Sequence, residues 1–248
     1  MVGKDIYLLL YLTKMNLKEL LTKSCIKEKI NVFSTLHFAK ICRKFLFYGY
    51  FYDDDTKYDE LYEEVKSLLK DILIEPHVDL FFKKLYDIRV KLETDIEAVI
   101  NGDPAVLSKQ EIVLCYPGLE AITYYRIAHE IYLLGYKLTA RIISEYAHRK
   151  TQIDIHPAAQ IGEHFCIDHG TGVVIGGTAV IGNNVRLYQG VTLGAKWLND
   201  VSKVKNIKRH PTILDNVIIY ANATILGGNT IIKEGSIIGA NAFITNSN

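Results

Sequence analysis

The sequence predicts an α+β protein, with an all-helical N-terminal domain at residues 1–150 and a parallel β-solenoid at residues 151–248. Aliphatic residues that recur at every sixth position predict the solenoid, and apolar residues at every third or fourth position predict the helices. With 248 residues, the chain is long enough for one large or two modest cores.

The six-residue repeat carries the fold prediction. Its anchors are Ile155, Ile161 and Ile167 and, after a two-residue slip, Ile175, Ile181, Leu187 and Leu193. A helix would scatter this period around its circumference, and a plain amphipathic strand needs only a period of two. Short strands with a corner every six residues fit the pattern, because three sides per coil stack the anchors into apolar columns. The period alone does not define the hand of the coil.

A basic segment at residues 195–211 interrupts this repeat. We interpret it either as a solvated loop or as a lid beside a polyphosphate ligand. Beyond Ile225 the repeat continues either in frame at Ile231 or one residue later at Ile232. We expect the later frame, because Gly227-Gly228 can hold the extra residue as a bulge.

Three apolar runs predict helices before the solenoid. The first, at 61–72, stops before Pro76, and the second, at 81–99, ends at Asn101-Gly102. The third follows Pro117-Gly118 and keeps one apolar face over residues 127–142, with Gly135 as a bend. Asn16 followed by Glu19 resembles a capping box near the start of the chain.

Composition limits the partners and the compartment. The net charge is +1, so no global field favours nucleic acid or a membrane surface. The apolar run at 6–12 is too short to span a bilayer. The cysteines are widely spaced, at Cys25, Cys42, Cys115 and Cys166, and form no CxxC pair. We therefore expect a cytoplasmic protein with reduced thiols.

Several motifs, spread over residues 80–245 and in a shared order, closely resemble the serine acetyltransferase family. They read DIHPAAQIG, DHGTGVVIG, TAVIG, YQGVTLG and KRHPTI. The family is part of the hexapeptide-repeat acyltransferases. The resemblance implies a left-handed β-helix of about four coils and transfer of an acetyl group from acetyl-CoA to L-serine, the first committed step of cysteine biosynthesis.

A histidine and an aspartate are the candidate catalytic pair. Acetyl transfer to a primary alcohol needs a base for the hydroxyl proton, and a carboxylate on the other ring nitrogen would orient the imidazole. Asp154 and His169 are 15 residues apart, close to one turn of an 18-residue coil. The resemblance assigns the base to His169 and its orienting partner to Asp154.

The resemblance also implies binding residues for both substrates. For serine it points to Asp103 and Pro104 of the GDP motif, Asp168, Arg209 and His210. Carboxylates for the ammonium and arginine for the carboxylate suit a zwitterion. For acetyl-CoA it points to Gly194, Ala195, Lys196, Gly227 and Ala240.

The resemblance further implies a homotrimer or a dimer of trimers.

The sequence departs from the family's pattern at two places, which limits what the resemblance implies. Gly177 stands where many family members have glutamate, and only TNSN follows Ile244. The family's tail, which covers CoA, senses cysteine and docks on O-acetylserine sulfhydrylase, is therefore not expected to act here.

Three alternatives remain open at this point. The chain could acetylate another hydroxyl acceptor, such as a sugar, an antibiotic or homoserine. It could be a catalytically weak scaffold that assembles partner enzymes. His164 and His169 also have an HxxxxH spacing, which resembles the metal-binding spacing of γ-class carbonic anhydrases, but zinc would need a third donor and we expect no metal.

Overall fold

A computed structural model describes residues 30–196 and 207–247, and the described residues from Asn31 onward form one compact unit. The apolar run at 6–12, the capping pattern at Asn16, Cys25 and most of the 195–211 segment lie outside the described residues. Among the helices that are described, none is long and apolar enough to cross a membrane.

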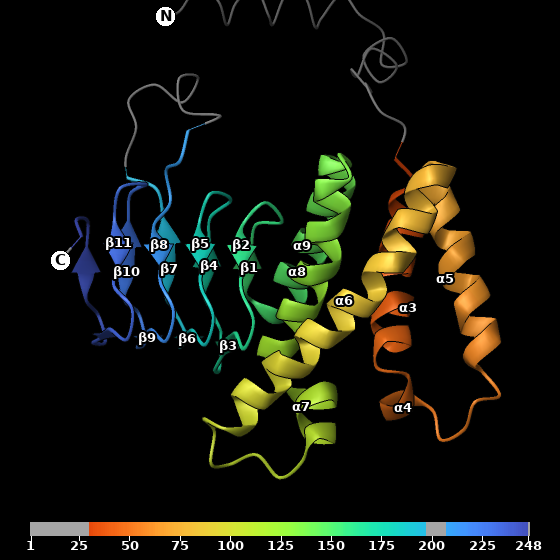
Figure 1. Cartoon of the computed structure of the whole chain (residues 1–248), viewed down its shortest axis with the longest axis horizontal. Coiled ribbons are helices and arrows are strands. Elements are labelled where there is room, and N and C mark those ends of the chain that lie inside the picture. Colours follow the sequence, from red (N-terminus) through yellow and green to blue (C-terminus); the bar gives the residue numbers. More distant parts are fainter. Residues whose placement is uncertain (1–29, 197–206, 248) are drawn as a thin grey trace, which may run out of the picture. The chain divides into compact units, whose positions relative to one another are not determined.

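The described helices precede the strands, as the apolar spacing predicts (Figure 1). They are α3 (Val32–Leu46), α4 (Tyr48–Phe51), α5 (Tyr58–Ile72), α6 (Glu75–Ile100), α7 (Lys109–Cys115), α8 (Pro117–Leu133) and α9 (Lys137–Thr151). Helix α5 buries Leu61, Val65 and Leu69, and α6 buries a long face from Val78 to Val99. The C-cap of α6 is Asn101, which confirms the predicted end of that run.

The prediction of one helical face through Gly135 is wrong. Gly135 has φ +98° and separates α8 from α9, and the two helices pack closely on each other. Because the chain turns back over residues 134–136, the apolar period restarts in α9. Leu138, expected on the buried face, is 52% exposed, and Ala140 and Ile143 are buried in its place.

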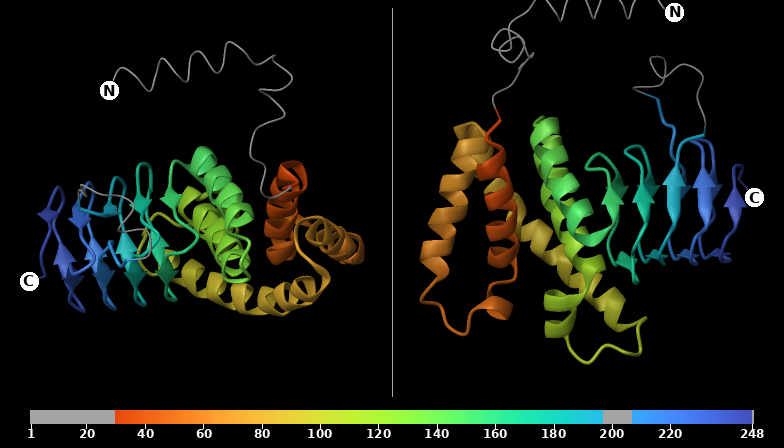
Figure 2. Two further views of the ribbon diagram at one scale, coloured as in Figure 1. Left: turned by 90° about the horizontal axis from the view of Figure 1, so that it is seen from above. Right: turned by 180° about the vertical axis from the view of Figure 1, so that it is seen from behind.

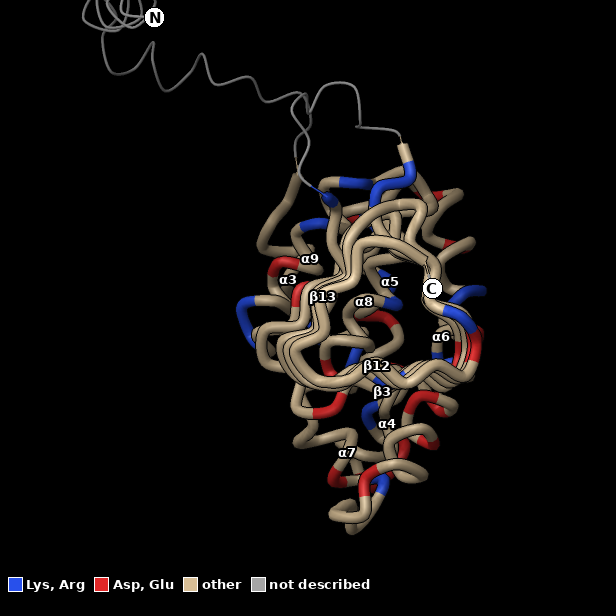
Figure 3. The backbone as a smooth tube through the Cα atoms, turned by 90° about the vertical axis from the view of Figure 1, so that its left-hand side faces the viewer, with Lys and Arg blue, Asp and Glu red and all other residues tan. Residues whose placement is uncertain are grey.

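The strands build three parallel sheets that form the sides of the solenoid. One holds β1-β4-β7-β10-β13, the second β11-β8-β5-β2 and the third β12-β9-β6-β3. Their bounds are β1 (Asp154–Ile155), β2 (Gln160–Ile161), β3 (Cys166–Ile167), β4 (Val174–Ile175), β5 (Val180–Ile181), β6 (Arg186–Leu187), β7 (Thr192–Gly194), β8 (Thr212–Ile213), β9 (Ile218–Ile219), β10 (Thr224–Leu226), β11 (Ile231–Ile232), β12 (Ile237–Ile238) and β13 (Phe243–Ile244). They complete four coils and begin a fifth, and the coils overlie one another in the view along the solenoid (Figure 3).

The predicted anchors stack in register inside these coils. Ile155 pairs with Ile175, and Ile175 with Leu193, so each sheet contributes one buried column. In the last coils Ile232 pairs with Ile213 and is 3% exposed, whereas Ile231 is 42% exposed. The frame that slips by one residue is thereby confirmed, and Gly227, with φ +105°, lies at the slip.

Helices α6, α8 and α9 join the solenoid at its first coil. Helices α6 and α8 contact β3, and α9 contacts β1. In both views of Figure 2 the green helices α8 and α9 lie between the solenoid and the red-orange helix α3. Buried apolar residues continue from the helices into the coils as one core.

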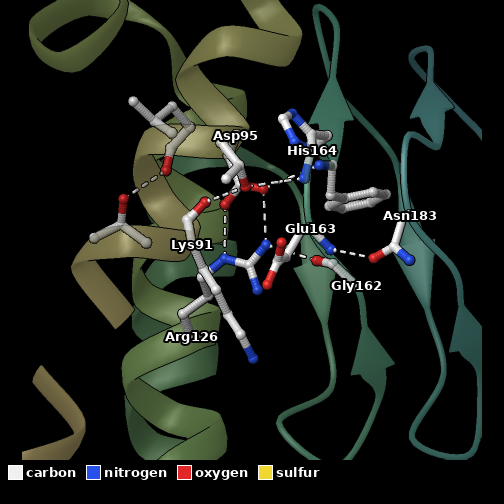
Figure 4. Close-up of polar contacts among 11 residues, drawn as sticks. Lys91, Asp95, Arg126, Gly162, Glu163, His164 and Asn183 are labelled. Atoms are coloured by element: carbon white, nitrogen blue, oxygen red, sulfur yellow. Dashed lines mark hydrogen bonds and ion pairs between the residues drawn. The ribbon is translucent and has the colours of Figure 1, made fainter. Parts of the chain in front are cut away.

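A buried ion pair lies within this junction (Figure 4). Arg126 of α8 donates two hydrogen bonds to Asp95 of α6 and a third to the carbonyl of Gly162. The Asp95 carboxylate also accepts the backbone N–H of Phe165. The pair therefore ties two helices to the first coil, just before the strand that leads to His169.

Candidate active site

The corner between β3 and β4 carries two of the predicted site residues, Asp168 and His169. His169 has φ +57°, and Gly170 and Gly172 have φ +92° and +81°. This left-handed backbone turns the longer corner of the coil and accounts for the two-residue slip seen in the sequence. The His169 side chain is 71% exposed, and its Nε2 lies 3.8 Å from Oδ1 of Asp168.

The loop after α6 brings Asp103 to the same region. Its carboxylate accepts the backbone N–H of Ala105 at 2.8 Å and the hydroxyl of Tyr116 at 2.9 Å. These hydrogen bonds, helped by the positive charge of Arg186, lower the pKa of Asp103. Asp103 is therefore ionised at neutral pH, so an ammonium group would meet a charged carboxylate here. Pro104 follows on the exposed surface.

Sequence reasoning missed two residues that organise this corner. Burial and the hydrogen bond to Asp103 raise the pKa of Tyr116 to about 12, so Tyr116 stays a donor. Arg186 of β6 lies with Nη1 3.6 Å from Oδ2 of Asp168. The register pairs Arg186 with Cys166, two residues before Asp168, so the repeat itself could have placed this arginine near the corner.

Asp154 lies at the start of β1 and faces helix α9. Its carboxylate and donor atoms of Glu145 and His148 lie within 4.8 Å of one another. No hydrogen bond joins Asp154 to His169 in the described part of the chain, although both belong to the first coil. The catalytic pair therefore stays a prediction, which needs the two side chains to approach each other when substrate is bound.

Arg209 and His210 lie at a different corner, on the other side of the sheet that begins with β1. His210 is 8% exposed as a residue, and Nδ1 of its ring lies 2.8 Å from the hydroxyl oxygen of Thr178. The backbone N–H groups of Arg209 and His210 donate to that hydroxyl. Lys208 donates to three backbone carbonyls around them. Thr178 and Lys208, which sequence reasoning did not single out, therefore fix this corner.

Glycines give the histidines of this corner their space. A Cβ built on Gly176 would lie 2.0 Å from the His210 ring, and one on Gly177 would lie 2.7 Å from Nδ1 of His156. Burial, together with the charges of Arg209, His156 and Lys208, lowers the pKa of His210 to about 4. His210 is therefore neutral at pH 7. Gly177, which stands at the position of the family glutamate, packs against the His156 ring.

Four of the residues predicted for acetyl-CoA lie together along β7 and β10. The N–H of Gly227 donates to the carbonyl of Gly194, and the Lys196 side chain passes close over Gly227. Ala195 is half-buried between Gly194 and the exposed Lys196. Ala240 is exposed in the turn between β12 and β13, so the structure does not group it with the others on one chain.

Two larger cavities are formed by the described residues, and the smaller one borders Gly102 and Arg186, next to the corner of Asp103 and Asp168. One of about 590 Å³ lies between α3, α8 and α9, and another of about 310 Å³ lies beside Arg186; neither is lined by His169 or Arg209. Among the described residues, Glu145, His148 and Asp154 are spaced as metal ligands could be, and this group contains neither His164 nor His169.

Comparisons with known proteins agree with the fold and the motifs. No family model matches the chain. It is 52% identical over 170 residues to a plasmid serine acetyltransferase of Synechococcus elongatus, which is 67% of this chain and 53% of that protein. The chain thus spans about half the length of that relative. It is also 47% identical over 165 residues to serine acetyltransferase of Bacillus pumilus, which is 66% of this chain and 70% of that protein.

Solved structures extend this similarity to a larger share of the chain. Serine acetyltransferase isoform 3 of Entamoeba histolytica, solved in complex with cysteine, superposes with a TM-score of 0.76 at 38% identity, over 89% of this chain and 79% of that one. The native serine acetyltransferase 1 of the same organism has a TM-score of 0.77 at 37% identity, over 89% and 85%. The solenoid is thus the left-handed β-helix of these enzymes. With these identities and coverages, the chain belongs to the serine acetyltransferase family.

Proposed function

We propose that this protein transfers the acetyl group of acetyl-CoA to the hydroxyl of L-serine, giving O-acetyl-L-serine and CoA. The observation that carries the proposal is the corner at Asp168 and His169, where two carboxylates, those of Asp103 and Asp168, lie beside an exposed imidazole. Carboxylates can hold the ammonium of an amino acid while the imidazole accepts a hydroxyl proton.

In this mechanism His169 removes the proton of the serine hydroxyl as its oxygen attacks the thioester carbonyl. The tetrahedral intermediate then collapses and breaks the C–S bond. The thiolate of CoA leaves with the proton that His169 returns. Asp154 would orient the imidazole and stabilise its protonated form, once a hydrogen bond between the two has formed.

Arg209 and His210 would complete the site from a neighbouring protomer. On one chain, Asp168 and His169 lie at the corner that precedes β4, whereas Arg209 lies at the corner that precedes β8. In a trimer of side-by-side solenoids, one corner of a protomer faces the other corner of its neighbour. The Arg209 guanidinium would bind the serine carboxylate.

The same arrangement would place acetyl-CoA in the groove between two solenoids. Gly194, Ala195 and Gly227 let pantetheine approach the backbone, and Lys196 offers a charge to its phosphates. Ala240, at another corner, would belong to the neighbouring wall of the groove. We assign assembly, as a trimer or a dimer of trimers, to the helical domain 1–150, and catalysis to the solenoid 151–248. With free thiols at Cys42, Cys115 and Cys166, the enzyme would act in the reducing cytoplasm.

The test is release of CoA, followed with a thiol reagent, from purified protein, acetyl-CoA and a panel of acceptors. L-Serine should support release, and His169→Ala should lower it by about 10³-fold without altering the circular dichroism spectrum. Release with L-homoserine or a hexose, but not with L-serine, would reject serine as the acceptor. No release with any acceptor would favour a scaffold.

A further inference from the structure

The Arg186 guanidinium connects the end of helix α6 to the corner that carries Asp168. Its Nη2 donates to the carbonyl of Ala98 at 2.5 Å, and its side chain is 13% exposed. The neighbouring carbonyls of Glu97 and Val99 accept backbone N–H groups of the chain that follows the helix. Arg186 thus satisfies one of the last carbonyls of α6, where the helix dipole also favours a cation.

Gly102 makes room for this guanidinium. A Cβ built on Gly102 would lie 1.7 Å from Nη2 and 2.2 Å from Cζ of Arg186. Gly102 has no positive φ that would require glycine, and the three atoms nearest to an added Cβ all belong to Arg186. Because Gly102 directly precedes Asp103, the arginine packs against the start of the loop that presents the Asp103 carboxylate.

The other edge of the guanidinium faces Asp168. Nη1 lies 3.6 Å from Oδ2 of Asp168 and is buried without a hydrogen-bond partner among the described residues. A buried unpaired donor is costly, so a small movement of Asp168 toward Nη1 would be favourable. One rigid, planar cation therefore spans the loop of Asp103 and the corner of Asp168, which a flexible lysine could not do.

We propose that Arg186 is a positioning residue for the acceptor amino acid, and that it holds the Asp103 loop and the Asp168 corner at the spacing their carboxylates need to bind an ammonium group. This inference rests on the proposed function. It assigns Arg186 an effect on serine binding and none on the proton transfer at His169.

The test compares Arg186→Met, Arg186→Lys and Gly102→Ala with wild type, in steady-state kinetics at varied L-serine and varied acetyl-CoA. Gly102→Ala keeps the arginine but displaces its flexible end. Gly49→Ala is the matched control, because a Cβ added at that helical glycine meets no atom within 4 Å outside its own stretch of helix. Thermal unfolding of each variant monitors the fold.

We expect Arg186→Met to raise KM for serine by about 10- to 100-fold, with kcat within about threefold of wild type and KM for acetyl-CoA unchanged. Gly102→Ala should show the same pattern more weakly. Arg186→Lys should raise KM for serine less than Arg186→Met does. Lysine keeps the positive charge but cannot contact the Ala98 carbonyl and Asp168 at the same time.

Unchanged KM for serine in both Arg186→Met and Gly102→Ala would overturn the inference. The inference would also be overturned if kcat fell and the KM values for both substrates rose to the same extent, together with a lower Tm. That pattern would mean that Arg186 only stabilises the fold. Wild type that releases no CoA with serine would instead reject the proposed function, and the inference with it.

Discussion

The Asp95 carboxylate holds the Arg126 guanidinium through two hydrogen bonds of 2.6 and 2.7 Å at the junction of the helices and the solenoid. The two side chains are 0% and 4% exposed. Both partners also bind the backbone of the first coil, at Phe165 and Gly162. Because both side chains are shielded from solvent, water cannot replace either partner, and each charge is compensated by the other residue.

Removing one member of this pair should therefore destabilise the protein strongly. We expect Arg126→Met to lower the free energy of unfolding by about 3–5 kcal/mol, because it leaves the Asp95 charge buried and uncompensated. Urea unfolding measures the effect. The exposed pair Lys84–Asp87 gives the control, since Lys84→Met should change stability by less than about 1 kcal/mol. Similar losses in the two variants would contradict this account.

The register of the last coils can be tested by a pair of adjacent isoleucines. Ile232→Ala opens a cavity in the apolar column and should cost about 2–4 kcal/mol. Ile231→Ala, at a side chain that is 42% exposed, should cost less than about 1 kcal/mol. Denaturant unfolding measures the free energy of unfolding of both variants. A larger decrease for Ile231→Ala than for Ile232→Ala would mean that Ile231, and not Ile232, is the buried anchor.

The low pKa of His210 predicts a loss of stability in acid. In the folded protein burial and the neighbouring cations lower this pKa from its usual 6.5 to about 4. Between these values the unfolded chain binds a proton that the folded chain does not. The stability present above pH 6.5 therefore declines as the pH falls toward 4, by less than about 1.4 kcal/mol per pH unit for one proton.

His210→Gln removes this titration. Urea unfolding at several pH values between 7.5 and 5 should show a shallower decline for the variant than for wild type, whatever its stability at pH 7.5. Parallel curves for the two proteins would mean that His210 keeps an ordinary affinity for protons in the folded state.

A site shared between protomers predicts that two inactive variants restore each other. His169→Ala and Arg209→Ala, each nearly inactive alone, would place an intact His169 beside an intact Arg209 when they are co-assembled. Random mixing in a trimer should regain activity at roughly a quarter of all sites, and at about one site in three in the mixed trimers that carry both variants. Differently tagged subunits, co-expressed and purified through both tags, allow the measurement. Activity that stays at the level of the single variants would mean that both residues serve one protomer.

The six-residue period of the sequence was sufficient to predict the solenoid and, with Gly227-Gly228, the frame of the last coils. Each coil is a local unit, because an anchor such as Ile175 is buried only by its own turn and by the anchors above and below it. The helices over 61–72 and 81–99 were predictable for a similar reason, since their apolar faces repeat over several turns.

Only the tertiary structure decided how the helices meet the coils. The turn at Gly135 reverses the chain, which the apolar period alone did not reveal. Arg186 reaches Ala98, 88 residues away, and Asp154 faces α9 because of how that helix docks on β1. Such contacts depend on the packing of distant elements, so the sequence by itself determined the candidate residues for the chemistry, and the packing decided which of them meet on one chain.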